Sequence, residues 1–466
     1  MTDAPLILWF RRDLRLTDHP MLTAALASGR PVVPVFILDP ETEAQGAAAK
    51  WRLGLAVAAF GQSLARLGGR LVLRRGPALE VLRGLLAETM AGGVMWTRLY
   101  DPVSRRRDQA VKAALQAAGV EAASFAGHAL HEPWRVETGQ GGYYKVFTPY
   151  WRAIRQLDPG AVLAAPKALR GPDRWPEGER LEDWALGSGM QRGGAVVLAY
   201  QRVGEAAALA RLWDFLDQRV AGYHQRRDYL ADPAPSGLSE NLSYGEIGPR
   251  QVWHAGRQAM DDGKAGAETF LKELAWRDFA QHLAFHAPEI TTENWKPGWD
   301  SFPWRGDNTD AERWRRGTTG EPVVDAAMRQ IYVTGTMHNR ARMIVASYLT
   351  KHLLTDWRVG QAWFADCLTD WDPASNAMGW QWVAGSGPDA APFFRIFNPA
   401  TQAAKFDPEG IYQRRWLDPA QPEARAFFDA VPKSWKLHPS SRYPEPLISL
   451  EAGRARALAA FAKRNA

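Results

Sequence analysis

The chain has 466 residues, of which 46% are hydrophobic and 23% are charged, with a formal net charge of +6. This length allows two or three domains, and the sequence has neither an apolar run near the ~20 residues of a membrane span nor a secretory signal pattern, so we expect a cytoplasmic protein. The single cysteine, Cys367, excludes an intrachain disulfide, and the ten histidines form no HExxH pair, so we expect no metal site.

The first 125 residues alternate short apolar runs with Ala/Leu-rich helical segments. This alternation predicts a doubly wound, five-stranded parallel sheet, a Rossmann-like α/β domain over residues 1–125. The phosphate-binding pattern GxGxxG is missing after the first run, where "WFRRDLRL" stands instead, so a standard dinucleotide site is not expected. The predicted strands are 6–10, 32–38, 70–76, 94–100 and 122–125, and the predicted helices are 48–67, 77–90 and 103–118.

Residues 126–199 are rich in Gly, Pro and charge, and they predict a long connector that wraps the surface of a domain. From residue 200 onward helical patterns replace the strand pattern, which predicts a larger, all-helical domain over 200–466. Most of the positive excess lies in residues 1–125, so a nucleic-acid site in the helical part has to be a local patch. The predicted helices of this part are 201–219, 246–261, 266–286, 322–333, 338–354 and 358–369.

The segment "APSGLSENLSYGEIGPRQVW" (234–253) places small hydroxyl residues before a helix. Such a helix start can bind an anion through free backbone N–H groups, in which case Ser236 and Ser239 could hold a diphosphate. The simpler interpretation, which the sequence alone favours, is a helix N-cap.

In "FLKELAWRDFAQHL" (270–283), Glu273 and Arg277 are four residues apart on one helix, which predicts a surface ion pair. Further on, Arg342 interrupts the apolar part of "TGTMHNRARMIVASYLTKHLLTDW" (334–357). A buried arginine needs a carboxylate partner, and Asp370 and Asp372 are the candidates. Both lie in "TDWDPASNAMGWQW" (369–382), which holds three Trp and could otherwise be a solvated turn followed by core residues.

Taken together, the motifs resemble the cryptochrome/photolyase family over roughly residues 5–450. The resemblance rests on "WFRRDLRL", "ELAWRDF", "VDAAMRQ", "MHNRARMIVASYLTK" and "NAMGWQW", and it is strongest to class I cyclobutane pyrimidine dimer DNA photolyases. It implies an α/β domain, a connector and a helical domain that binds a U-shaped FAD. The implied diphosphate residues are Tyr223, Ser236, Leu238 and Ser239, and those around the isoalloxazine and ribose are Arg277, Asn339, Arg342, Asp370, Asp372 and Asn376.

The resemblance also assigns an electron path and a substrate site. Asn376 would face flavin N5, where its neutral amide favours repair over signalling, and Trp380, Trp357 and Trp304 would carry electrons from the flavin to the surface. Trp276 and Trp382 would clamp a flipped pyrimidine dimer by stacking, and Glu273 would hydrogen-bond its base edge. The remaining implied contacts are Asn339 and Met343 to the dimer, and Arg227, Arg342, Gln402 and Lys405 to DNA phosphates.

The implied function is light-driven repair of cyclobutane pyrimidine dimers in DNA by electron transfer from excited, reduced FAD, in a monomer. A second, antenna chromophore would lie in the α/β domain near Asp39, Lys50 and Asp101. A deazaflavin is slightly favoured over FMN, over folate and over the absence of an antenna, and Ser104 stands where folate-using relatives have Glu. The alternatives are a (6–4) photolyase, a cryptochrome-like blue-light photoreceptor and a flavin-binding carrier without photochemistry.

Overall fold

The computed structural model describes residues 4–465 and begins with the predicted five-stranded sheet. All neighbouring strands are parallel, in the order β3-β2-β1-β4-β5. The predicted sheet is therefore confirmed, and the first two strands have the predicted bounds. The strands are β1 (Leu6–Phe10), β2 (Val32–Leu38), β3 (Val72–Arg75), β4 (Gly93–Thr97) and β5 (Glu121–Phe125).

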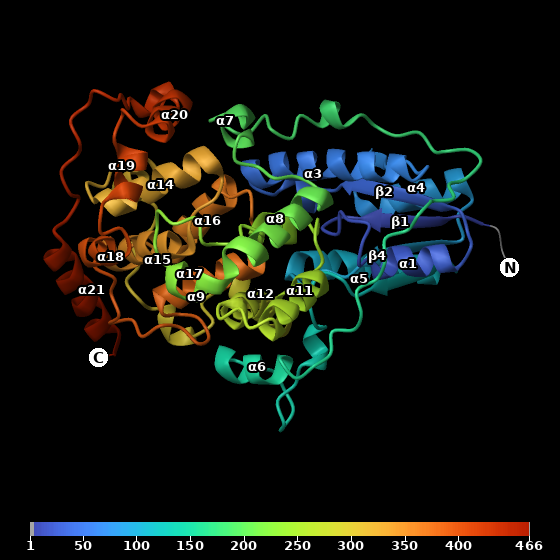
Figure 1. Ribbon diagram of the computed structural model, residues 1–466, viewed down its shortest axis with the longest axis horizontal. Helices are drawn as coiled ribbons and strands as arrows, with labels where there is room; N and C mark the ends of the chain where they lie inside the picture. The colour runs from blue at the N-terminus through green and yellow to red at the C-terminus, as the bar shows by residue number, and fades with distance from the viewer. Residues whose placement is uncertain (1–3, 466) are drawn as a thin grey trace.

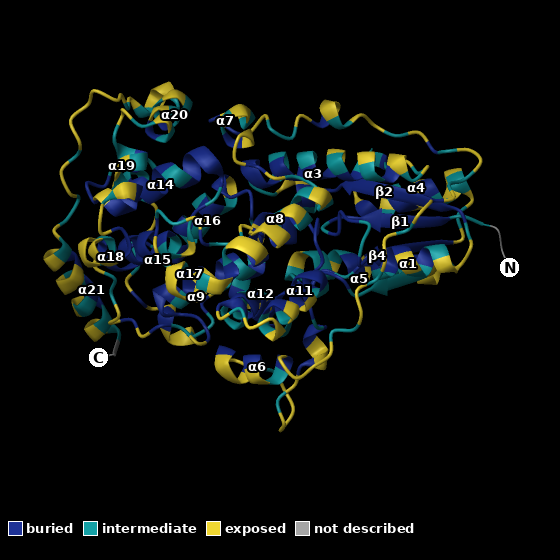
Figure 2. Cartoon of the chain, in the orientation of Figure 1, coloured by how far each residue is buried: buried dark blue, intermediate teal, exposed yellow. Residues whose placement is uncertain are grey.

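Both faces of this sheet are covered, which explains why β1 and β2 consist of continuous apolar residues. Alternate side chains of β1 point to opposite faces: Leu6 and Phe10 join the core under one pair of helices, whereas Ile7 and Trp9 join the other core. The first core contains residues of α1 (Pro20–Ala27) and α3 (Ala47–Arg66); the second contains residues of α4 (Ala78–Thr89) and α5 (Pro102–Ala117). Figure 2 shows the central strands as buried.

The connector leaves the sheet after β5, first packs against the helical part through residues 130–154, and then runs along the outside of the α/β part (Figure 1). It bonds to the edge of that part: the backbone N–H of Leu169 donates to Leu67 O and that of Glu179 to Leu73 O. Its regular elements are short, as its composition predicts: η1 (Pro133–Arg135), α6 (Phe147–Ile154), η2 (Leu181–Trp184) and α7 (Gly194–Leu198).

Residues from 200 onward form a mostly helical body with two main cores. The expected helix over 338–354 is α15 followed by a π-helical turn, Tyr348–His352. The helices are α8 (Glu205–Gln218), α9 (Tyr223–Arg226), α10 (Ser239–Ser243), α11 (Pro249–Asp261), α12 (Ala267–His286), α13 (Thr309–Arg315), α14 (Pro322–Thr334), α15 (Asn339–Ser347), α16 (Trp357–Cys367), α17 (Pro373–Ala384), α18 (Pro399–Phe406), α19 (Ile411–Leu417), α20 (Pro422–Ala430) and α21 (Leu450–Asn465).

A buried ion pair joins the two parts of the chain. Arg52 of α3 donates two hydrogen bonds to Glu246, at 3.0 and 2.7 Å, and both side chains are completely buried. Glu246 precedes α11, so the pair fixes the segment between α10 and α11 against the α/β part. Among residues 4–465, no helix is long and apolar enough to cross a membrane.

Candidate functional site

The stretch 369–382 is a helix start rather than a solvated turn. Asp372 is the N-cap of α17, with its carboxylate accepting from the backbone N–H of Ser375 at 2.7 Å, and Pro373 occupies the first turn. Both are strong N-terminal signals, because a side-chain acceptor satisfies a free N–H and proline lacks one. This start places Asp370 just outside the helix and Asn376 in its first turn, where the Asn376 amide donates to Asp372 O at 3.0 Å.

Arg342 pairs with Asp370, the first of its two predicted partners. The guanidinium Nη2 lies 2.7 Å from Asp370 Oδ2, and Arg342 Nε donates to Met337 O at 2.9 Å. The Asp370 side chain is 3% exposed, whereas 24% of the Arg342 side chain is exposed. The second carboxylate oxygen, Asp370 Oδ1, is buried without a hydrogen-bond partner. Because an unpaired buried acceptor is costly, this oxygen fits a donor group on a bound cofactor.

The predicted surface pair between Glu273 and Arg277 does not form. Arg277 faces inward and donates to His128 O at 2.8 Å, and burial, as the largest cause, lowers its pKa. Glu273 instead pairs with Arg227, which follows α9 and reaches the outer side of α12. The prediction was wrong because helix spacing shows which side chains are neighbours on α12 but not which groups other elements bring to them.

Asp372 is also held from two other parts of the chain. Gln281 of α12 donates to both of its carboxylate oxygens, at 3.2 and 3.0 Å. Arg12, from the "WFRRDLRL" motif, lies 3.9 Å from Asp372 Oδ2 and donates to Trp371 O at 2.5 Å. Arg12 follows β1, at the position where a dinucleotide-binding domain has its glycine-rich phosphate loop, and here it contacts the helical part instead. The sequence did not identify Arg12 or Gln281 as site residues.

The segment before α10 does not use its hydroxyl groups as helix caps. Leu238 is the N-cap residue of α10 and has no side-chain cap bond; Ser236 Oγ only accepts a long hydrogen bond of 3.4 Å from Leu238 N. Ser239 is exposed and Tyr223 is buried. The N-cap interpretation that the sequence favoured is thus wrong for this turn, because the helix begins two to three residues after Ser236. The anion-binding interpretation stays a prediction.

Trp276 of α12 is stacked on an aromatic ring from the connector. The ring centroids of Trp276 and Phe147 are 3.6 Å apart with an interplanar angle of 8°. Phe147 begins α6, and its backbone N–H donates to Asp389 Oδ2 at 3.0 Å. The connector therefore supports one face of Trp276, a contact that no periodicity in residues 126–199 could reveal.

The other predicted substrate residues lie on α15, α17 and α18. Asn339 is the first residue of α15, with Met343 one turn later, and Trp382 is half-buried near the end of α17, which packs against α12 and α15. Two residues predicted to contact phosphates are already engaged, since Arg227 pairs with Glu273 and Arg342 with Asp370. On α18, Lys405 lies over the ring of Phe406, and Gln402 Oε1 is buried without a partner.

The three predicted electron-transfer tryptophans differ in burial. Trp357 is completely buried and Trp380 is 3% exposed, whereas Trp304 is half-buried. Gly360 of α16 makes room for Trp380, since a Cβ there would lie 2.1 Å from the indole ring. Trp314, which the sequence did not single out, lies edge-on to Trp380 at 6.1 Å and is completely buried.

The residues expected to bind an antenna chromophore have local partners. Asp39 caps α2 (Pro40–Glu43) and pairs with Arg107 at 2.7 Å, Asp101 caps α5, and Lys50 donates to Glu43 O at 2.9 Å. The identity of such a chromophore stays a prediction. Within residues 4–465, no group of His, Cys, Asp and Glu side chains is arranged to hold a metal.

Two family models match the chain. Residues 6–168 match the model described as DNA photolyase, and residues 270–463 match the one described as the FAD binding domain of DNA photolyase. The second match includes α15 and α17, which carry or flank the Arg342–Asp370 pair and Asn376.

Full-length relatives and solved structures agree with these models. The deoxyribodipyrimidine photo-lyase of Agrobacterium fabrum is 46% identical, with 98% of each chain covered. A class III photolyase structure from Agrobacterium tumefaciens is 44% identical with a TM-score of 0.90, covering 100% of this chain and 98% of that one. The Synechocystis cryptochrome structure is 29% identical with a TM-score of 0.84, covering 98% and 100%. A class III neighbour gives no support to the class I likeness that the sequence suggested.

Proposed function

Because the chain belongs to the photolyase and cryptochrome family, we propose that this DNA photolyase repairs cyclobutane pyrimidine dimers with light absorbed by FAD in the helical domain. The observation that carries the proposal is the Arg342–Asp370 pair, with one buried carboxylate oxygen unpaired, just before α17, the helix that carries Asn376. The site thus contains a fixed cation (Arg342), a buried acceptor without a donor (Asp370 Oδ1) and a neutral amide at the start of α17 (Asn376).

The residues of this site have the chemistry that a flavin requires. Asp370 Oδ1 would accept a hydrogen bond from the cofactor, the exposed part of Arg342 would stabilise negative charge on it, and Asp372 stays fixed by Gln281. The start of α10, which has no side-chain cap, would hold the diphosphate through Ser236, Leu238 and Ser239, together with Tyr223 from α9. FAD, when bound, reduced and excited by blue light, supplies the electron that opens the cyclobutane ring and takes it back afterwards.

Asn376 favours repair over signalling. An amide cannot deliver a proton as a carboxylic acid can, so this position would not protonate the flavin. The Asn376 amide nitrogen donates to Asp372 O at 3.0 Å, and the amide oxygen would face the cofactor. Trp380, Trp357 and Trp304 would restore the reduced state by carrying electrons inward from the surface.

The lesion would be bound outside the duplex. Damaged pairing lowers the cost of flipping the dimer, and aromatic stacking compensates for the stacking lost in DNA. Trp276, supported on one face by Phe147, and Trp382 would clamp the dimer, and Asn339 and Met343 would line its site. Glu273 would accept from the base edge, and Arg227 would then exchange its carboxylate partner for a DNA phosphate. Gln402 and Lys405 would position the backbone.

The test is the repair of oligonucleotides that carry one thymine cyclobutane dimer or one (6–4) lesion, by photoreduced protein, under blue light and in darkness. We expect light-dependent restoration of adjacent thymines from the cyclobutane dimer only. Repair of the (6–4) lesion alone would overturn the substrate assignment. Absence of repair despite bound, photoreducible FAD would instead favour a cryptochrome-like photoreceptor, in keeping with the similarity to the Synechocystis cryptochrome.

A further inference from the structure

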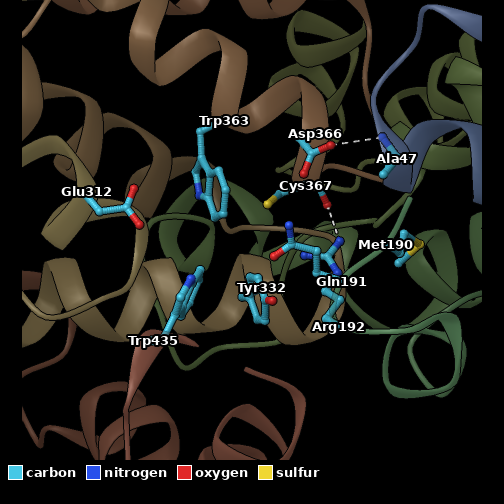
Figure 3. A pocket seen from close by; sticks show the side chains of 10 residues that line it. All are labelled: Ala47, Met190, Gln191, Arg192, Glu312, Tyr332, Trp363, Asp366, Cys367 and Trp435. Atoms are coloured by element: carbon cyan, nitrogen blue, oxygen red, sulfur yellow. Dashed lines mark hydrogen bonds between the residues drawn. The ribbon is translucent and has the colours of Figure 1, made fainter. Parts of the chain in front are cut away.

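The loop between α17 and α18, residues 385–398, is held by hydrogen bonds at its start. The backbone N–H of Gly387 donates to Gln381 O at 3.1 Å, and the hydroxyl of Ser386 donates to Gln381 Oε1 at 3.1 Å. None of the loop residues lines the cavity of about 210 Å³ between α14, α16 and the end of the connector, which Figure 3 shows. The shape of the loop therefore comes from its own contacts and not from that cavity.

A buried lysine joins the beginning of this loop to a point further along it. Lys351, in the π-helical turn, is completely buried, and its Nζ donates to Ala384 O at 3.0 Å and to Phe393 O at 3.3 Å. The same Nζ lies 3.5 Å from the centroid of the Phe393 ring. Burying such a polar group is costly unless its hydrogen bonds are made. Lys351 therefore stabilises the one shape of the loop in which both carbonyl oxygens face it.

Asp389 lies between these two anchor points and has an unfavourable backbone conformation. Its φ is +51°, in the left-handed region that favours glycine. A residue other than glycine keeps such a conformation where the surrounding contacts hold it. The Asp389 side chain is exposed, and its Oδ2 accepts from the backbone N–H of Phe147 at 3.0 Å. The strained turn thus directs the carboxylate toward the start of α6.

The carboxylate of Asp389 takes the place of a missing N-cap at α6. Phe147 is the first residue of this helix, and Val146 before it makes no side-chain cap bond. The first N–H groups of a helix have no partner within the helix, and a negatively charged acceptor at this end stabilises it. Because Asp389 belongs to a loop far along the chain, its bond also fixes where α6 lies relative to α17.

This bond connects the supports of the two rings of the proposed dimer clamp. Trp276 of α12 stacks on Phe147, with the ring centroids 3.6 Å apart. Trp382 lies near the end of α17, the helix that leads directly into the loop. The loop is therefore a direct link between the helix that carries one ring of the clamp and the residue that supports the other ring.

We propose that Asp389 is a positioning residue for the dimer clamp, which fixes α6 and, through Phe147, the plane of Trp276 relative to Trp382. The inference rests on the dimer-repair function proposed above. Loss of the Asp389 acceptor leaves the flavin site intact but lets the Phe147 ring and the Trp276 ring move together. It therefore weakens the binding of the dimer and not the electron transfer that follows.

Three variants of the FAD-loaded protein test this role by fluorescence anisotropy with a dimer-containing oligonucleotide. Asp389→Gly removes the acceptor and relieves the backbone, whereas Asp389→Asn loses the same charge but keeps an acceptor oxygen. Met90→Gly is the control, because Met90 is exposed with a φ of +53° but lies at the end of α4. We expect binding about 5-fold weaker in Asp389→Gly, as the loss of one hydrogen bond predicts, and wild-type binding in the other two. At saturating DNA, repair per absorbed photon should equal the wild-type value in all three.

A double substitution shows whether Asp389 acts through Phe147. In the Phe147→Ala background, Asp389→Gly should weaken dimer binding no further, because the ring that Asp389 positions is absent. A further loss of the same size in that background would refute the positioning role. So would wild-type affinity of Asp389→Gly, or equal losses in Asp389→Gly and Asp389→Asn.

Fluorine NMR of the DNA-free, FAD-loaded protein separates this inference from the repair function. With 5-fluorotryptophan incorporated, the Trp276 signal is the one that is missing from Trp276→Phe. We expect Asp389→Gly, but not Asp389→Asn, to shift or broaden this signal. An unchanged Trp276 signal in Asp389→Gly would overturn the inference. A shifted signal, together with a wild-type protein that does not bind the dimer, would overturn the repair function and leave the link between Asp389 and Trp276 in place.

Discussion

At the scale of single residues, the site depends on side chains whose partners come from distant parts of the chain. Arg342 and Asp370 are 28 residues apart, and Arg12 and Asp372 come from opposite ends of the chain. A buried charge without a partner is strongly unfavourable, so such pairs constrain the positions of the elements that carry them. Arg342 and its partner could therefore be predicted from the sequence, because an arginine inside an apolar helix pattern requires a carboxylate close by.

Removal of Arg342 tests the strength of this pair. Arg342→Met leaves the Asp370 carboxylate buried and unpaired, and we expect the free energy of unfolding to fall by about 3 kcal/mol in urea titrations. Arg180→Met is the matched control, because the Arg180–Glu182 pair is 76% and 75% exposed and should contribute less than about 1 kcal/mol. Equal effects of the two substitutions would show that the Arg342–Asp370 pair contributes no more to the free energy of unfolding than an exposed ion pair does.

Trp357 tests the electron path at one residue. Phenylalanine fills most of its buried volume but is much harder to oxidise, so Trp357→Phe should slow photoreduction of the bound flavin at least ~10-fold. Repair by chemically reduced protein should persist, because that reaction does not use the path. Trp371→Phe, in the same part of the fold, is the control, and photoreduction is followed by absorbance. Unchanged photoreduction in Trp357→Phe would mean that this tryptophan is only a core residue.

At the scale of elements, the sequence predicted the helices and strands whose hydrophobic pattern can be recognised within one short stretch of the chain. The strands of the sheet could be found because continuous apolar runs mark strands buried on both faces. The start of α17 could not be told from a solvated turn, although Asp372 and Pro373 are ordinary helix-start residues, because a carboxylate and a proline ring fit both interpretations. The stack of Phe147 on Trp276 could not be predicted, because a connector without periodicity does not indicate where it packs.

The α6 segment gives an element-scale prediction. Phe147→Ala removes the ring behind Trp276, and an aromatic pair contributes about 0.5–1.5 kcal/mol beyond its buried area. We therefore expect roughly 10-fold weaker binding of a dimer-containing oligonucleotide, measured by fluorescence anisotropy, with FAD content unchanged. Val146→Ala is the control, since that neighbouring side chain is exposed and lies outside the stack. Equal affinity of the two variants would remove Phe147 from the substrate site.

At the scale of the whole molecule, buried histidines couple stability to pH. Burial, as the largest cause, lowers the pKa of His282 to about 3 and of His352 to about 4. The unfolded chain binds these protons near pH 6.5. Between pH 6.5 and 4 the unfolded state therefore takes up more protons, and these groups lower the free energy of unfolding as the pH falls. Asp278, whose pKa burial raises, acts in the opposite sense.

Because these effects oppose one another, the test is a difference between variants. His282→Gln should reduce the loss of unfolding free energy between pH 6.5 and 4.5 by up to about 1.4 kcal/mol per pH unit. The exposed His224→Gln is the matched substitution. Urea unfolding at several pH values measures both. A pH profile of His282→Gln that is parallel to the wild-type profile would contradict the assignment of this linkage to His282.

The whole molecule combines an α/β part and a helical part that are joined by the buried Arg52–Glu246 pair, and the site lies in the helical part. The central claim is that light absorbed there repairs a dimer clamped by Trp276. The most direct measurement is the number of thymine dimers restored per absorbed photon by the wild type, Trp276→Ala and Trp371→Phe. We predict repair by the wild type and Trp371→Phe, and at least ~10-fold less at limiting DNA by Trp276→Ala. Equal repair by all three, or no light dependence, would contradict the claim.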